Sequence, residues 1–250
     1  MTAPLTRAEK TLRTRRRMLD AAARLFVERG WTGATVEDIA RAAEVGVQTV
    51  YFTFGTKRAL LGEVLDTAIA GDADPAATLD RPWAREVVAE PDPAGQLARQ
   101  AAGARRVLER AAPVLEVVRT AATAEPELAA LWRTNLEQRH TVQLHFAHAL
   151  TAKTALTARA AKTGGAAKTG EAARTGGAAR TGGSGNDGGT GNDDEPGGPL
   201  RDGHDARSAA DIMFTVLGPE TYGLLVTTQG WSPDRWERWA ADLLTRQLLP

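Results

Sequence analysis

The stretch VGVQTVYFTFGTK, residues 45–57, decides the fold because its composition and its periodicity point to different structures. Its many β-branched and aromatic residues favour a strand. Neither face of that strand would be consistently apolar, however, and the chain offers no convincing second strand to pair with it. With a helical period, Val47, Val50 and Phe54 share one face of residues 47–54. The sequence therefore predicts a short helix, whose outward face carries Gln48, Thr49, Phe52 and Thr53.

Amphipathic helices are predicted on both sides of this stretch. Residues 13–29 repeat apolar side chains with a helical period, and Gly30 is a plausible stop. Thr35 begins a variant of the capping box and opens a short helix over 36–43. Residues 57–70 carry a further apolar stripe of leucine, valine and alanine. We therefore expect an all-α fold.

The helical pattern continues beyond residue 71. We expect helices near 83–88, over 94–111, over 114–124 and from Pro126 to about residue 150, with Pro113 separating the second from the third. Three more helices follow Asp205; they end at Gly218, at Gly230 and near the C-terminus.

Residues 161–204 differ in kind from the rest of the chain. They contain the successive hexads KTGGAA, KTGEAA and RTGGAA and hold 14 of the 25 glycines. With almost no large apolar side chains, such a segment cannot offset the entropy lost on ordering. We expect a disordered insertion within a C-terminal part that spans 72–250. Residues 1–56, with a basic arm, are predicted to form an N-terminal unit, and residues 57–71 a connecting helix.

The composition excludes several classes of protein. The 250 residues include no cysteine, which excludes disulfides, thiol catalysis and cysteine-based zinc sites. No apolar run approaches the roughly 20 residues of a membrane span, and no secretory signal is present. No nucleophile–base pair, phosphate loop or set of metal ligands is visible, and the spacing of His140, His145 and His148 suits a metal poorly. We expect a cytoplasmic, non-enzymatic protein without a cofactor or metal.

The helix pair around Glu44-Val45-Gly46 has the spacing of a helix-turn-helix, whose second helix can enter the DNA major groove. Gln48 and Thr49 suit base edges, and Phe52 suits thymine methyl groups. Phosphate contacts are expected from Tyr51, Thr53 and Lys57. The net charge of the chain is zero, yet residues 7–17 are basic, and Arg15 and Arg16 are expected to attract DNA without regard to its sequence.

The stretch AARLFVERGWTGATVEDIARAAEVGVQTVYFTFGTKRALL, residues 22–61, resembles the DNA-binding signature of the TetR family of bacterial transcriptional regulators. The resemblance implies that Thr35, Gln48, Thr49, Tyr51 and Lys57 touch DNA. Three positions depart from the usual pattern of the family: Glu44 replaces a glycine, Gly46 a serine cap and Thr53 a phosphate-binding histidine. A left-handed Glu44 would cost roughly 1–2 kcal/mol.

The resemblance also implies a homodimer that binds a palindromic operator, most often as a repressor, and a small-molecule effector held among the middle helices. Dimer surfaces would fall at 207–229 and 233–249, with the apolar residues Ile212, Val216, Trp236, Trp239 and Leu243. The same stripe could instead form a core within one chain. An apolar pocket is expected at Trp132, Leu136, His140, Phe146 and Tyr222, each of which could equally be ordinary core.

Two other interpretations remain open at the level of sequence. The regulator could act through a protein partner without an inducer, or its C-terminal part could hold a fused small-molecule or metal site. The operator, the effector, the direction of regulation and the role of residues 161–204 are not determined by the sequence.

Overall fold

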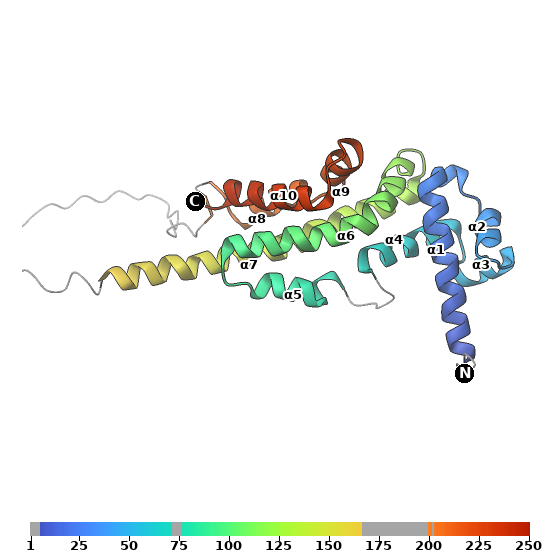
Figure 1. Ribbon diagram of the computed structural model, residues 1–250, viewed down its shortest axis with the longest axis horizontal. Coiled ribbons are helices and arrows are strands. Elements are labelled where there is room, and N and C mark those ends of the chain that lie inside the picture. The colour runs from blue at the N-terminus through green and yellow to red at the C-terminus, as the bar shows by residue number, and fades with distance from the viewer. Residues whose placement is uncertain (1–5, 72–76, 167–199, 202) are drawn as a thin grey trace, which may run out of the picture.

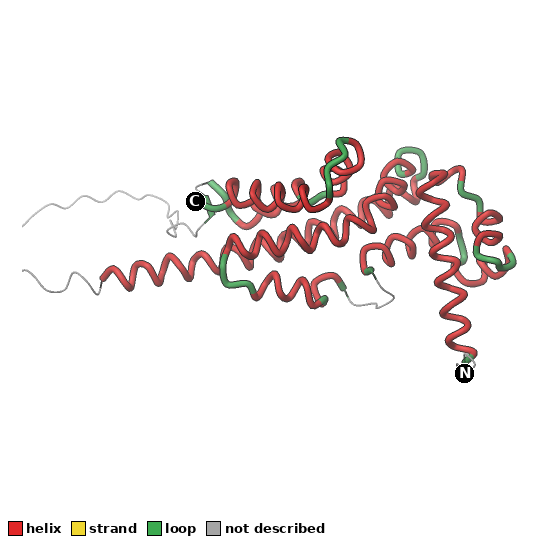
Figure 2. The backbone as a smooth tube through the Cα atoms, in the orientation of Figure 1, coloured by secondary structure: helices red, strands yellow, loops and turns green. Residues whose placement is uncertain are grey.

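The computed structural model describes residues 6–71, 77–166, 200–201 and 203–250, and for residues 154–166 it describes the backbone alone. The described residues form helices joined by loops, without a strand (Figure 2). The predicted all-α class is confirmed. Figure 1 shows an elongated molecule in which the first helices gather at one end of two long central helices.

The N-terminal end of the molecule consists of four helices. They are α1 (Arg7–Gly33), α2 (Val36–Ala42), α3 (Val47–Phe54) and α4 (Lys57–Ala70). The helical reading of 47–54 is therefore correct. Helix α1 begins six residues earlier than predicted, because Thr6 and Glu9 form a reciprocal capping box. Near its end Gly30 adopts a φ of 70°, which kinks the helix at the predicted stop.

One apolar core holds these four helices together. It includes Phe26 of α1, Ile39 of α2, Val50 of α3 and Leu61 of α4, all 0–2% exposed. Residues in the C-terminal half of the next long helix complete this core, among them Val118. The position of α3 is thus fixed by burial on one face only, and its opposite face is left to solvent.

The central layer consists of three helices after the short 3₁₀ turn η1 (Thr78–Asp80): α5 (Pro82–Ala89), α6 (Pro93–Ala121) and α7 (Pro126–Ala166). The predicted break at Pro113 is wrong, since α6 runs through it (Figure 1). A proline inside a helix removes one hydrogen bond and costs about 3 kcal/mol. Burial of Ala111, Ala112, Val114 and Leu115 around the exposed Pro113 accounts for the intact helix.

The C-terminal part packs against the central layer. It contains α8 (Ala206–Val216), α9 (Pro219–Tyr222), the short π-helix η2 (Gly223–Thr228) and α10 (Pro233–Leu248). Figure 1 shows α8 and α10 on one side of α6 and α5 on the other. A second core joins α6, α7, α8 and α10 through residues such as Leu97, Leu150, Met213 and Trp236.

The boundaries of the predicted insertion need correction at both ends. Helix α7 continues to Ala166, and Leu200 is 6% exposed and belongs to the second core. Residues 203 and 204 are also described. The glycine-rich repeats between these points lie outside the described residues.

Candidate nucleic-acid interface and internal cavity

Helix α3 presents a polar and aromatic face to solvent. Gln48, Thr49, Tyr51 and Phe52 are exposed, and Phe52 is 93% exposed. The helix is anchored by Val50 and Phe54, which are 2% and 6% exposed. A fully exposed phenylalanine has no role in the packing of the protomer, so this face is suited to a partner.

Thr53 lies at the edge of that face and is half-buried. Its hydroxyl donates to the carbonyl oxygen of Thr49, 2.7 Å away, one turn earlier in the helix. That bond occupies the hydroxyl proton and leaves the oxygen as an acceptor, which does not suit a phosphate. The predicted phosphate contact of Thr53 would require this bond to open.

The turn between α2 and α3 places Glu44 in the left-handed region, with φ 53°. It is the one non-glycine residue with a positive φ in the described part of the chain. The amide of Val45 donates to the carbonyl of Ala40 at 3.0 Å and closes the turn. Gly46 begins α3 without a side-chain cap. Both departures noted in the sequence are therefore accommodated without loss of the helix-turn-helix geometry.

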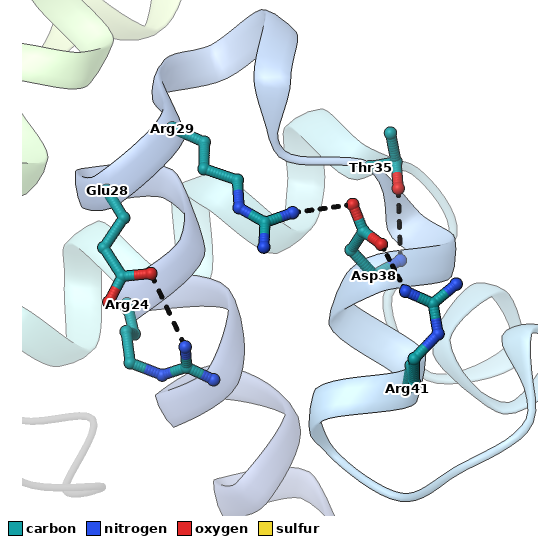
Figure 3. A network of polar contacts seen from close by, with 6 residues as sticks. All are labelled: Arg24, Glu28, Arg29, Thr35, Asp38 and Arg41. Atoms are coloured by element: carbon teal, nitrogen blue, oxygen red, sulfur yellow. Dashed lines mark hydrogen bonds and ion pairs between the residues drawn. The ribbon is translucent and has the colours of Figure 1, made fainter.

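Asp38 links α2 to α1 and fixes the start of the helix pair (Figure 3). Its carboxylate accepts from Arg29 at 2.9 Å and from Arg41 at 2.6 Å. Its backbone amide donates to the hydroxyl of Thr35, 3.1 Å away, as a helix cap. The bond from Arg41, and after it that of Thr35, lowers the pKa of the Asp38 carboxyl. Thr35 thus caps α2 and is at the same time exposed to solvent.

Arg15 and Arg16, the two predicted basic contacts to DNA, differ in whether their side chains are already engaged within the protomer. Arg15 forms an ion pair with Glu63 of α4, and its guanidinium lies 4.8 Å from the ring centre of Phe54. It therefore joins α1, α3 and α4 and is engaged within the protomer. Arg16, whose side chain is 85% exposed, has only a 4.0 Å pair with Asp20 and remains free to approach DNA.

Lys57 begins α4 and is tied to the end of α1. Its ammonium group donates to the carbonyl oxygen of Trp31 and lies 4.3 Å from the centre of the Trp31 ring. Burial lowers the pKa of Lys57, and the charges of Glu125 and Glu37 partly oppose that effect. The side chain positions α4 relative to α1, whether or not it also reaches a phosphate.

A second site is a partly open cavity of about 130 Å³ among α5, α6 and α7. Its walls include Trp83, Val107, Leu108 and Phe146, with Ile69 from the end of α4. Sequence reasoning missed the polar groups that line it. They belong to Thr78, Gln100, Asn135, Gln138, Arg139 and Gln143. Gln100 and Asn135 are buried although polar, and their place on the inward face of α6 and α7 was the available signal.

Of the five predicted pocket residues, Phe146 lines the cavity and the other four do not. Tyr222 packs edge-on against Trp236, with ring centres 5.1 Å apart, in the second core. His140 is paired with Asp211 at 2.7 Å. Trp132 packs against the first core, and Leu136 is half-buried outside the cavity wall. Apolar residues at helical spacing do not reveal which face meets a void.

The predicted dimer residues also separate into two groups. Trp236 is 0% exposed and Val216 is 8% exposed, so both belong to the core of the protomer and cannot supply a partner surface. Ile212, Trp239 and Leu243 are half-buried and retain accessible surface on α8 and α10. The apolar stripe of α10 therefore has two parts. Trp236 packs in the core of the protomer, whereas Trp239 and Leu243 lie at its edge and keep part of their surface accessible.

Within the described ranges, no helix has both the length and the apolar character required to cross a membrane. Nor do the described residues bring three histidine, aspartate or glutamate side chains together as metal ligands.

Comparison with known proteins points in one direction. Residues 18–64 match the family described as bacterial regulatory proteins, tetR family. No curated protein matches the chain. Among solved structures, a putative transcriptional regulator from Saccharomonospora viridis in complex with choline is similar, with a TM-score of 0.60 and 17% identity over 94% of this chain and 97% of that one.

Two further solved structures share the fold. NalD of Pseudomonas aeruginosa, the secondary repressor of the MexAB-OprM multidrug efflux pump, has a TM-score of 0.60 and 18% identity, covering 96% of this chain and 98% of its own. FadR of Bacillus subtilis in complex with stearoyl-CoA has a TM-score of 0.57 and 14% identity, covering 92% and 96%.

Proposed function

We propose that the chain, whose residues 18–64 match the TetR family of bacterial regulatory proteins, is a DNA-binding transcriptional regulator that binds a palindromic operator as a homodimer and releases it when a small molecule fills the cavity. The observation that carries the proposal is the exposed face of α3. Its side chains have no role in packing, whereas the opposite face is buried in the first core. In this proposal residues 1–56 form the DNA-binding domain, 57–71 connect it, and 72–250 regulate and dimerise.

The readout follows from the chemistry of the exposed side chains. In the major groove the amide of Gln48 can pair with the edge of adenine, and the hydroxyl of Thr49 can bind either kind of base edge. Phe52 can pack against the methyl group of thymine. Tyr51, Thr35 and Arg16 would bind phosphates and set the register of the helix on the duplex. Arg15 would act indirectly by holding α3 against α1 and α4.

Dimerisation is assigned to the outer surfaces of α8 and α10. Ile212, Trp239 and Leu243 leave apolar surface exposed there after the core of the protomer is complete. A two-fold axis at this surface would present the two α3 helices to successive major grooves about 34–36 Å apart. The two-fold symmetry of the protein would then match that of the operator.

A route from the cavity to α3 is provided by α4. Ile69, near the end of α4, lines the cavity, and only two residues separate the end of α3 from the start of α4. A ligand that fits better with a displaced α4 would favour that conformation and move α3 away from the spacing that DNA requires. The structures of relatives with choline and stearoyl-CoA, and the repressor role of NalD, support a ligand-responsive repressor.

Selection of bound DNA from a random pool tests the proposal. We expect a palindromic sequence with half-sites one helical turn apart. The double substitution Gln48→Ala and Thr49→Ala should weaken binding to that sequence by roughly 30-fold or more, since each good base contact is worth about 1–3 kcal/mol and two contacts are lost. The matched control is Thr134→Ala with Glu137→Ala, an exposed pair on α7 away from α3 and from the proposed dimer surface. Unchanged binding by the α3 double variant would exclude direct readout by this helix.

A further inference from the structure

The cavity contains three polar atoms that have no hydrogen-bond partner within the described residues. They are Oε1 of Gln100, Oδ1 of Asn135 and Nη1 of Arg139. Gln100 is 1% exposed and Asn135 is 4% exposed, so bulk water does not reach them freely. Buried polar groups in native proteins are almost always paired, and each unpaired group destabilises the fold. Three such atoms among the residues that line one cavity mark it as a site where a bound group can supply the missing partners.

The side chain of Gln100 is oriented by its surroundings. Its Nε2 donates to Oε1 of Gln143 at 2.6 Å and lies 3.4 Å from the sulfur of Met213. Both neighbours are acceptors, so the amide nitrogen lies on their side, and the carbonyl oxygen is the atom left without a partner in a residue that lines the cavity. Gln100 and Asn135 therefore both offer acceptors to a ligand that carries a hydroxyl or amide donor.

Arg139 is the one ionisable residue among the described residues that line the cavity. Its side chain is 18% exposed and packs 4.6 Å from the ring centre of Phe214. Burial lowers the pKa of the guanidinium, and Glu220 partly opposes this, although arginine stays charged in proteins.

The carboxylate of Glu220 neutralises Arg139 incompletely. Its Oε2 accepts from Nη2 at a long 3.4 Å, and its own side chain is 48% exposed to water. Nη1 remains without an acceptor. The cavity thus carries positive charge together with a free donor, a combination that fits a carboxylate.

The apolar residues that line the cavity determine the size and polarity of the rest of the ligand. Trp83, Leu108, Val142 and Phe146 are apolar or aromatic and take up most of the lining. A water-sized group needs about 10–15 Å³ of such space, so 130 Å³ holds a compound of roughly ten non-hydrogen atoms.

We propose that the cavity selects a small carboxylic acid with an apolar or aromatic body, which binds Arg139 through its carboxylate and Gln100 or Asn135 through a hydroxyl or amide donor. This inference rests on the proposed function, because it names the effector class of the same cavity. A quaternary amine such as choline is disfavoured, since it would bring a second positive charge beside Arg139.

Two matched sets of probes test the charge preference on the full-length protein. One set is 4-hydroxyphenylacetate, 4-hydroxyphenylacetamide and tyramine, and the other is hexanoate, hexanamide and hexylamine. Thermal shift and calorimetry should show that an acid binds at least tenfold more tightly than its amide and that neither amine binds. Equal binding of acid and amide, preference for an amine, or failure of both acids to bind would overturn the proposal.

Two variants separate ligand binding from structural support. Arg139→Gln and Glu220→Gln both break the ion pair between α7 and α9, yet the first removes the charge that binds the acid and the second releases it. We expect at least tenfold weaker acid binding for Arg139→Gln and equal or tighter binding for Glu220→Gln. Equal loss in both variants would mean that the ion pair matters only for the fold. Arg133→Gln, which removes an exposed charge from the same helix, serves as the control.

The donor contact has its own readout. In the wild type, 4-hydroxyphenylacetate should bind more tightly than phenylacetate, and Gln100→Leu with Asn135→Leu should abolish that advantage. The same compounds are also titrated into the complex of the protein with its selected operator. This experiment tests the proposed function and the acid assignment separately. An acid that binds without releasing DNA contradicts the proposed function alone, whereas release by an amine contradicts the acid assignment alone.

Discussion

Arg17 of α1 lies beside Glu44 of the turn, with Nη1 3.2 Å from Oε2, and Glu44 has the left-handed φ of 53°. The contact joins the first helix of the DNA-binding unit to the turn that sets the angle between α2 and α3. Both side chains are largely exposed, 43% and 80%, so the pair itself adds little stability. The strained backbone at Glu44 is therefore only weakly compensated.

Glu44→Gly is expected to raise the free energy of unfolding by up to about 1 kcal/mol. Glycine removes the roughly 1–2 kcal/mol of left-handed strain but gives up some of this through the entropy of the unfolded chain. Glu44→Val should instead destabilise the protein, because a β-branched side chain is least compatible with positive φ. Urea denaturation measures both changes, and Arg17→Gln is the control that removes the ion pair alone. Equal destabilisation by glycine and valine would contradict the backbone explanation.

The contacts of Asp38 with Arg29, Arg41 and Thr35 predict that the stability of the protein depends on pH. The folded protein lowers the pKa of Asp38 below its ordinary 3.8, chiefly through Arg41. A carboxyl with a lowered folded pKa contributes stability above its unfolded pKa and loses it as the pH falls through the folded value. At pH 7 Asp38→Asn should therefore lower the urea midpoint. The gap between variant and wild type should narrow below pH 3.8 and close once Asp38 is protonated in the folded state.

Glu37→Gln provides the control for this titration, since Glu37 is an exposed neighbour on the same helix. Its midpoint should stay near that of the wild type across the pH series. A gap for Asp38→Asn that is independent of pH would show that the carboxylate charge is not what stabilises the helix pair.

Lys57 is predicted to stabilise the DNA-binding unit before any contact with DNA. Lys57→Gln removes a charged donor from the carbonyl of Trp31 and a cation from its ring. We expect a loss of about 1 kcal/mol, below the usual range for charged hydrogen bonds because the site is partly open to water. Arg58→Gln is the neighbouring control, whose pair with Glu127 is exposed and should matter less. Similar thermal midpoints for the Lys57 variant and the wild type would refute this role.

The helices could be predicted because each buries one face, and α3 shows this most clearly. Val50 and Phe54 repeat with the period of a helix, and their burial overrides the β preference of the neighbouring residues. The same reasoning failed at Pro113, where local chemistry predicts a break. The energy that keeps α6 intact comes from packing against other helices, among them α1, α4 and α10, which are distant from Pro113 in the sequence.

The sites were predictable to different degrees for a similar reason. Exposed residues of α3 follow from a short local pattern, so Gln48 and Phe52 could be placed on the surface. A cavity is a place where helices from distant segments fail to fill space, and apolar periodicity alone cannot locate it. Gln100 and Asn135 were detectable only as polar residues on the buried faces of helices.

Arg110 of α6 is predicted to fasten the end of α4 beside the cavity. Its Nε donates to the carbonyl of Ala68 at 3.1 Å, and its Nη2 donates to that of Ile69 at 3.2 Å. These carbonyls lie in the last turn of α4, which Gly71 ends with φ 80°. A positive charge at this position also favours the negative end of the helix dipole. Arg110 thus connects α6 to the part of α4 that contributes Ile69 to the cavity.

Arg110→Ala should fray the last turn of α4 and leave α1 to α3 intact. Hydrogen exchange followed by mass spectrometry should show several-fold faster exchange in the peptide covering 64–71, because each lost hydrogen bond is worth about 0.5–1.5 kcal/mol. Arg110→Lys should restore only part of the protection, since a lysine cannot bind both carbonyls with a planar fork. Arg106→Ala is the matched control, because Arg106 accepts from Arg110 through its backbone and not its side chain. If α4 stays fully protected in Arg110→Ala, its last turn is held by packing alone and the link through Arg110 is excluded.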